Sequence, residues 1–367
     1  MSNITAIATL CGEYPVNQTQ MKDYLDSIYE DKTVIRKYKA LLKDESIRFK
    51  NSVIPDYQPG CKNHVLYKPE NLQPGTAERM KIYGKESVRL GFAVAREAIS
   101  KADLKKQDIT HIITVSCTGF SAPGLETLLL EKLELNNNVK RFTVNFMGCY
   151  AAFHGMRLAD LICKSEPSAK VLLVSVELCS LHFRKDISED NILSTYLFSD
   201  GAAACIVSND APISKKYLSC CSFDSLLIPE GKNDMGWYVG NNGFEMILSR
   251  DVPGHIENNI AKAFNDFIEG NGLSKEEITH YAIHPGGKNI LKAFERALIL
   301  PEEKLAESYE VLQNYGNMSS ATILFVLQKF LEKPFSGKSG EWLYSAAFGP
   351  GITVESGLFK IINQGNE

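Results

Sequence analysis

Residues 104–111 read LKKQDITH, and residues 273–280 read LSKEEITH. Each stretch follows an amphipathic segment, 87–102 or 256–272, and leads into a short apolar run. Apolar residues with the period of a helix, followed by a polar loop and an apolar run, predict a helix, a loop and a strand in that order. Because the same order occurs twice at a long interval, the sequence predicts a duplicated α/β unit.

Two further pairs of segments extend this repeat. Residues 148–162, GCYAAFHGMRLADLI, correspond to residues 316–330, GNMSSATILFVLQKF, since both open with glycine and small residues and continue as an apolar helix. Residues 198–208, FSDGAAACIVS, correspond to residues 348–359, FGPGITVESGLF, since both place a glycine turn before a strand. The pairs follow one another in the same order, which chance explains less easily than any single match.

The repeat divides the chain into an N-terminal half, residues 1–215, and a C-terminal half, residues 216–367. The second half is shorter between its last two repeated segments. The excess in the first half falls at residues 179–197, CSLHFRKDISEDNILSTYL, which we interpret as an insertion. Insertions on a rigid scaffold often carry function.

The composition of the chain limits the class of protein. Its 367 residues are 44% apolar and 23% charged, which is ordinary for a globular protein of two fused units. A net charge of -4 provides no basic field for nucleic acid or an anionic membrane surface. We expect no signal peptide and no membrane span, because no suitably long apolar run is present. The nine scattered cysteines predict free thiols and a cytoplasmic protein.

Three residues of the repeat have the chemistry of an acyl-transfer site. Cys149 and Asn317 correspond in the two units, and both are expected at helix N-termini that face one central place. His284 ends the second ITH strand and precedes a Pro-Gly-Gly turn. A histidine can hold a thiolate as an ion pair, and histidine and asparagine can donate hydrogen bonds to an enolate oxygen. On this basis we expect the pKa of Cys149 to lie below that of a free thiol.

Each of these residues also has a purely structural interpretation. A cysteine in an apolar run is usually a small core residue, and a histidine before Pro-Gly-Gly is usually a turn residue. Asn317 would cap a helix, a role that is compatible with catalysis. The spacing by itself leaves these alternatives open.

Seven segments, taken in order, resemble the chalcone synthase-like or type III polyketide synthases: VSCTGFSAPG, FMGCYAAFHGMRLA, LFSDGAAACIV, SRDVPGHI, AIHPGGKNIL, YGNMSS and AAFGPGITVESGLF. The segment MGWYVGNNGFEMILS is more similar to bacterial members than to plant ones. The resemblance covers nearly the whole chain, and residues 1–80 match least. It implies an α/β thiolase fold with a duplicated, five-layered αβαβα architecture, and a homodimer.

The resemblance also implies a reaction. An acyl-CoA starter would be loaded on Cys149 and extended by repeated decarboxylative Claisen condensation with malonyl-CoA. The chain would then cyclise to a resorcinol, pyrone or phloroglucinol-type product. His284 and Asn317 would be the catalytic partners, and Phe198 would lie between the CoA tunnel and the acyl cavity. Acyl-CoA and malonyl-CoA would be substrates, with no further cofactor and no metal.

Positional match to the family places the pocket at a further set of residues: Cys117, Cys179, His182, Met246 and Ser319. Ala122, which precedes Pro123, would reach the cavity of the partner subunit. Several positions depart from plant enzymes, which have threonine at the positions of Cys117, Cys179 and His182. Met246 replaces a second gatekeeper phenylalanine, Ala347 begins the glycine-rich loop, and Trp237 replaces a small residue. These changes argue against a plant-like flavonoid product.

Basic residues that meet the CoA phosphates in plant enzymes lie in an early helix. Here the segment RKYKALLKDESIRFK supplies four candidates: Arg36, Lys37, Arg48 and Lys50. A charge run of this kind is most often a solvated face of a helix, so the register of these contacts stays open.

Three classes of function compete. The first is an iterative type III polyketide synthase, and the second is a single-condensation enzyme of the ketoacyl synthase III type. The second class favours another His-Asn arrangement and a docking surface for a carrier protein, so YGNMSS with one matched histidine favours the first. The third is a catalytically silent thiolase-fold protein that binds acyl groups, against which the intact Cys149, His284 and Asn317 argue. A papain-type cysteine hydrolase fits poorly, since nothing supplies a peptide groove.

Overall fold

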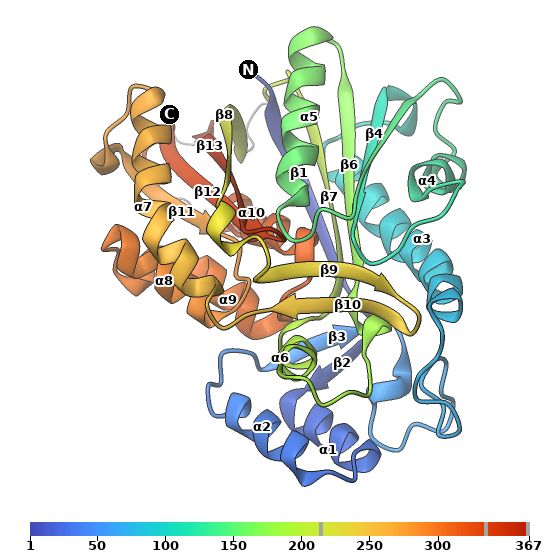
Figure 1. The fold of residues 1–367 in the computed structure, drawn as a ribbon. Coiled ribbons are helices and arrows are strands. Elements are labelled where there is room, and N and C mark those ends of the chain that lie inside the picture. The colour runs from blue at the N-terminus through green and yellow to red at the C-terminus, as the bar shows by residue number, and fades with distance from the viewer. Residues whose placement is uncertain (213–215, 334–336, 365–367) are drawn as a thin grey trace.

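The computed structural model of the protein describes residues 1–212, 216–333 and 337–364. Its centre is a sheet with the strand order β11-β12-β13-β8-β1-β7-β6-β4-β5 (Figure 1). The strands of this sheet are β1 (Asn3–Cys11), β4 (His111–Ser116), β5 (Lys140–Asn145), β6 (Lys170–Leu178), β7 (Asp200–Ser208), β8 (Lys216–Leu227), β11 (Ile278–Ile283), β12 (Glu341–Gly349) and β13 (Thr353–Asn363).

The pairing directions of the strands repeat on the two sides of the junction between β1 and β8. In the first half β1 pairs antiparallel with β7, β7 antiparallel with β6, and β6 parallel with β4. In the second half β8 pairs antiparallel with β13, β13 antiparallel with β12, and β12 parallel with β11. The predicted duplication of the α/β unit is therefore confirmed. The boundary expected at residue 215 lies outside the described residues.

The helices form layers around and between the strands. The helices are α1 (Gln18–Ile28), α2 (Lys32–Leu42), α3 (Thr76–Lys101), α4 (Leu125–Leu133), α5 (Ala151–Ser165), α6 (Glu189–Leu197), α7 (Val252–Gly270), α8 (Lys288–Leu298), α9 (Ala306–Tyr315) and α10 (Thr322–Glu332). Helices α3 and α4 lie on one outer side, and α7 and α8 on the opposite side (Figure 1). Short 3-10 turns connect the elements: η1 (Pro55–Tyr57), η2 (Lys106–Asp108), η3 (Cys179–His182), η4 (Pro229–Gly231), η5 (Lys275–Glu277), η6 (Glu302–Leu305) and η7 (Ser319–Ala321).

Helices α5 and α10 form the central layer. Phe153 and Met156 of α5 share one buried core with Ile323 and Phe325 of α10 and with strands of both halves. An apolar helix that is buried on most sides belongs in the interior of a layered protein, which explains the apolar sequence of α10. With the outer helices and the strands between, this central layer completes the five-layered αβαβα thiolase architecture that the resemblance implied.

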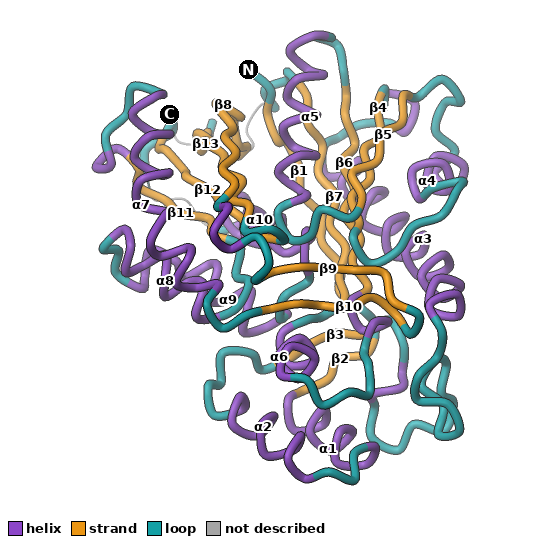
Figure 2. The backbone as a smooth tube through the Cα atoms, in the orientation of Figure 1, coloured by secondary structure: helices purple, strands orange, loops and turns teal. Residues whose placement is uncertain are grey.

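A smaller group of elements packs at one end of the central sheet. It comprises α1, α2 and the paired strands β2 (Tyr14–Asn17) and β3 (Phe49–Ser52), and the hairpin of β9 (Met235–Gly240) and β10 (Gly243–Leu248) passes beside it (Figure 2). The predicted insertion at 179–197 is confirmed as η3 and α6, since β12 and β13 are joined by a short turn alone. Helix α6 contacts α2 and β10, so the insertion joins this end of the molecule to the hairpin.

Within the described residues, no helix combines the length and the apolar character needed to cross a membrane.

Candidate active site

The two central helices each follow a short connection that carries one expected catalytic residue. Cys149 lies between β5 and α5, and Asn317 lies between α9 and α10. Each follows a glycine in the left-handed region, Gly148 with φ +82° and Gly316 with φ +69°. A Cβ atom on Gly148 would lie 2.4 Å from Pro350, so glycine is required there by close approach as well as by conformation. The repeated fold thus brings Cys149 and Asn317 together, as the sequence predicted.

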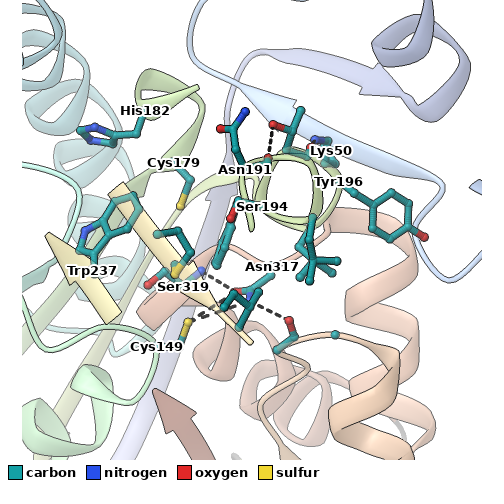
Figure 3. Close-up of a pocket in the computed structure, with 18 of the residues that line it drawn as sticks. Lys50, Cys149, Cys179, His182, Asn191, Ser194, Tyr196, Trp237, Asn317 and Ser319 are labelled. Carbon is teal, nitrogen blue, oxygen red and sulfur yellow. Dashed lines mark hydrogen bonds between the residues drawn. The ribbon is translucent and has the colours of Figure 1, made fainter. Parts of the chain in front are cut away.

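The side chain of Asn317 is held by hydrogen bonds on both of its polar atoms. Oδ1 accepts the Ser319 N–H at 2.8 Å, and Nδ2 donates to the Gly286 carbonyl at 3.1 Å. The Cys149 sulfur lies 3.9 Å from Nδ2 (Figure 3). The same sulfur lies 3.9 Å from Oδ1, so the end of the amide group, with its second N–H, lies beside the thiol. Asn317 therefore makes a contact like that of a helix cap and also lies beside the thiol of Cys149.

His284 follows β11 directly and enters the same cavity. Its backbone N–H donates to the Ala346 carbonyl at 2.8 Å, which continues the parallel pairing of β11 with β12. The residue is fully buried, and neither ring nitrogen has a hydrogen-bond partner among the described residues. Buried polar atoms are nearly always paired in folded proteins, so both ring nitrogens of His284 are available to a ligand in the cavity.

One cavity of about 720 Å³ connects these residues. That volume is typical of a small-molecule site. Besides Cys149, His284 and Asn317, the cavity is lined by nearly all of the expected pocket residues: Phe198, Cys117, Cys179, His182, Met246 and Ser319. Ala122 does not line it. Ala122 is exposed, in a loop whose Ala122–Pro123 peptide bond is cis, and a contact with a partner's cavity stays a prediction.

His182 forms part of an aromatic wall. Its Nδ1 accepts the Phe244 N–H at 3.0 Å, its Nε2 donates to the Thr118 carbonyl at 2.7 Å, and its ring stacks on Phe244 at 4.1 Å. Burial lowers the pKa of His182 to about 3. Trp237 adds its ring and donates to the Cys117 carbonyl at 2.7 Å. His182 is therefore a fixed, neutral surface and not an acid or base.

A buried carboxyl group below the pocket was missed by the sequence reasoning. Glu177 accepts the Cys117 N–H at 3.0 Å and the Thr118 hydroxyl at 2.9 Å, and Ser320 also donates to it. Burial raises its pKa. The signal in the sequence was a single acidic residue within the apolar strand KVLLVSVEL. A buried carboxyl group needs hydrogen-bond donors, and here they come from distant parts of the chain. Glu177 anchors the Cys117 end of the pocket.

The pKa expected for Cys149 is wrong for the resting site. Burial raises the pKa of its thiol to about 12, although hydrogen bonds from Ser319 and Asn317 act in the opposite direction. Burial also lowers the pKa of His284 to about 3. The sequence reasoning counted the helix N-terminus and the histidine but not the loss of water around a deep thiolate. Both shifts favour the neutral forms of Cys149 and His284.

The four candidates for contacts with CoA phosphates differ in their placement, and these contacts stay a prediction. Arg36, Lys37 and Arg48 are exposed and do not line the cavity, while Lys50 lines it but is buried. Arg250, which is exposed, and Lys288, which is half-buried, also line the cavity.

These two cations were not singled out from the sequence. Arg250 pairs with Glu189 at 2.6 Å, and Lys288 pairs with Asp44. The only signal was that Lys288 follows the Pro-Gly-Gly turn and Arg250 precedes α7. Arg250 thereby contacts the α6 insertion, and Lys288 begins α8.

A duplicated αβαβα fold with a thiol, a histidine and an asparagine in one cavity defines an acyl-transferring enzyme of the thiolase type. Family models agree: the N-terminal domain of chalcone and stilbene synthases matches residues 1–211, and the C-terminal domain matches residues 220–363. A putative chalcone synthase of Bacillus subtilis is 32% identical over 98% of this chain and 99% of its own length. The chain therefore belongs to the chalcone and stilbene synthase family of type III polyketide synthases, which are acyltransferases.

Other relatives support the same assignment. An alpha-pyrone synthesis polyketide synthase-like protein of Mycobacterium tuberculosis is 33% identical over 80% of this chain and 75% of its own. The crystal structure of PKS-I from the brown alga Ectocarpus siliculosus matches with a TM-score of 0.92 at 27% identity and 98% coverage of both chains. The 1,3,6,8-tetrahydroxynaphthalene synthase of Streptomyces coelicolor A3(2) has a TM-score of 0.88 at 25% identity, covering 98% of this chain and 99% of that one.

Proposed function

We propose that the protein loads an acyl-CoA starter on Cys149 and extends it by repeated decarboxylative condensation with malonyl-CoA. The extended chain then cyclises to a resorcinol, pyrone or phloroglucinol-type product. The observation that carries this proposal is that Cys149, His284 and Asn317 line one cavity, with Phe198 beside them. Membership of the family supports the reaction class.

Loading begins from two neutral groups. The Cys149 proton moves to a ring nitrogen of His284, and the thiolate attacks the thioester carbonyl of the starter. The bond between the carbonyl carbon and the CoA sulfur breaks, and the departing CoA thiolate takes the proton from His284. Burial raises the pKa of Cys149 and lowers that of His284, so the charged pair forms only transiently.

Chain extension relies on two hydrogen-bond donors, Asn317 and His284. Malonyl-CoA loses CO₂ when the bond to its carboxylate carbon breaks, and the electron pair becomes a thioester enolate. The enolate oxygen accepts hydrogen bonds from Asn317 Nδ2 and from the ring N–H of neutral His284. The enolate carbon then attacks the acyl carbonyl, and the Cys149 thiolate leaves. Decarboxylation supplies the carbanion, so the steps need no metal ion and no redox cofactor.

Phe198 is placed to favour the decarboxylation. It is half-buried, lines the cavity and forms a parallel bridge with Asn317. An aromatic side chain beside the donors disfavours a hydrated carboxylate at the carbon that reacts. Met246 on β10 completes this wall with a flexible thioether, which adapts to chains of different shape.

We also propose a cytoplasmic homodimer. Strand β5 is an edge strand of the sheet with mostly exposed side chains. Phe142 on this strand is exposed by 38%, and Phe120, which packs on Phe146 just after it, by 50%. Exposed apolar edges of this kind favour a partner subunit. The cysteines, all of them free thiols, suit a reducing compartment. Light scattering tests the assembly, and a fully active monomer would contradict it.

The function is tested with the purified protein, malonyl-CoA and a panel of acyl-CoA starters, with products read by mass and CO₂ release followed separately. We expect multiply extended products from at least one starter. Products with a single extension would favour the ketoacyl synthase III type. Neither CO₂ nor product would favour a silent acyl-binding protein.

A further inference from the structure

Lys50 is a buried cation on the wall of the catalytic cavity. It lies on β3, is 4% exposed and lines the cavity together with Asn317. Its stem packs beside the connection to α10, since a Cβ atom on Gly316 would lie 3.3 Å from Lys50 Cγ. Nζ donates to the Thr195 carbonyl, its one hydrogen-bond acceptor among the described residues. An ammonium group has three donors, so Lys50 has donor capacity left for a ligand.

The charge of Lys50 is not explained by an ion pair. The negative charge of Asp200 favours the charged form of Lys50. The effect of burial is larger and lowers the pKa of Lys50 to about 7. Asp200 itself already accepts the N–H and hydroxyl of Ser180 and the N–H of Val53. A buried cation without a close carboxylate is costly unless something else accepts its hydrogen bonds.

The cavity wall on the side of Lys50 includes several polar side chains. Asn191, Ser194 and Tyr196 lie on this side of the pocket, and Cys179, His182 and Trp237 lie on the other side (Figure 3). Much of this polar wall comes from α6, the insertion that the second half lacks. Asn191 and Ser194 already donate to backbone carbonyls, so the spare donor capacity on this side is that of Lys50. A chain that grows from Cys149 across the pocket therefore passes between the rings of His182 and Trp237 and the side that carries Lys50.

We propose that Lys50 is a specificity-determining residue that donates hydrogen bonds to keto oxygens of the growing chain. A poly-β-ketone carries a carbonyl acceptor on every second carbon, whereas an alkyl chain carries none. Lys50 therefore retains chains that have already been extended and favours further extension over early release. This inference rests on the proposed function, because it requires a chain built on Cys149.

Variants of two lysines on the same cavity test the inference. Lys50→Met should keep starter loading and CO₂ release within about twofold of the parent. The ratio of multiply to singly extended products should fall by about tenfold, as for loss of a hydrogen bond to a charged donor. Lys288→Met, at the start of α8, is the matched control and should raise the KM for CoA esters with an unchanged product ratio. A folded Lys50→Met protein with the parent ratio would overturn the inference, as would the same ratio change in Lys288→Met.

A second measurement does not depend on folding of a Lys50 variant. Carbamylation of Lys50 by cyanate, read by peptide mass, should slow by about threefold or more during turnover with starter and malonyl-CoA. Cys149→Ala binds the same CoA esters but builds no chain, so its Lys50 should stay reactive. Equal rates in the two proteins would overturn the inference. No extension by the parent would instead refute the proposed function, so the two failures are distinguishable.

Discussion

The N-terminal ends of α5 and α10 are the same place in the two repeated units, yet they differ in how firmly they hold their side chains. Asn317 is fixed by contacts at 2.8 and 3.1 Å to Ser319 and Gly286. Cys149 has its contact with Asn317 at 3.9 Å and opens onto the cavity. A group that donates to an enolate benefits from a fixed position, whereas a nucleophile must reach its substrate. The duplication thus supplies two equivalent positions, and the two side chains divide the chemistry.

The largest expected effect is on the α5 side. Cys149→Ala removes the acyl acceptor and should lower product formation by at least about a thousandfold. Cys163→Ala, in the helix that follows Cys149 and fully buried, is the matched control and should retain activity. Acyl loading is measured by the mass of the intact protein. Extension of any starter by Cys149→Ala would end the assignment of the nucleophile.

Substitutions on the α10 side should separate starter loading from the decarboxylation of malonyl-CoA. Asn317→Ala should still accept a starter on Cys149 but lose CO₂ release from malonyl-CoA by about two to three orders of magnitude, as for a lost oxyanion donor. His284→Ala should damage both steps, because His284 takes the thiol proton and also donates to the enolate. Single-turnover loading and CO₂ release are measured for both variants. Equal loss of loading in the two proteins would contradict this division.

The resting protonation state predicts a pH dependence for Cys149. With its pKa raised to about 12 by burial, the thiol is neutral at neutral pH, and the thiolate fraction rises with pH. The rate of Cys149 alkylation by iodoacetamide should therefore increase by about tenfold per unit above neutrality. Peptide mass after timed labelling gives the rate. A plateau that begins below neutral pH would show that the ion pair with His284 outweighs burial.

The stability of two glycine variants compares the connection before α5 with the connection before α10. Gly148→Ala and Gly316→Ala each place a side chain at a positive φ, at a cost of about 1–3 kcal/mol. Gly148→Ala should cost more, since its Cβ meets Pro350 at 2.4 Å whereas that of Gly316→Ala meets the Leu197 carbonyl at 3.1 Å. Denaturant unfolding measures both. Equal stability of the two variants would mean that the Pro350 turn moves without cost.

Most of the fold was predictable because it repeats. Helix periodicity and glycine turns are local, so the echo of LKKQDITH in LSKEEITH and the insertion at 179–197 were visible in the sequence. The correspondence of Cys149 with Asn317 follows from the same register. Most of the expected pocket residues line the cavity because positional match to a family transfers backbone position well. Ala122 needs a partner subunit to be tested.

By itself, the sequence determined the duplicated architecture and the residue types at the ends of its two central helices. Only the tertiary structure decided how those groups behave. Burial raised the pKa of Cys149, whereas the sequence predicted a lowered one. The packing of the chain placed Lys50 inside the cavity and not on an exposed, phosphate-binding surface. The physical reason is that hydration depends on every segment packed around a group, and the segments that enclose Cys149 and Lys50 come from both halves and from the insertion. Secondary-structure patterns are local, whereas the free energy of a buried charge is a property of the whole fold.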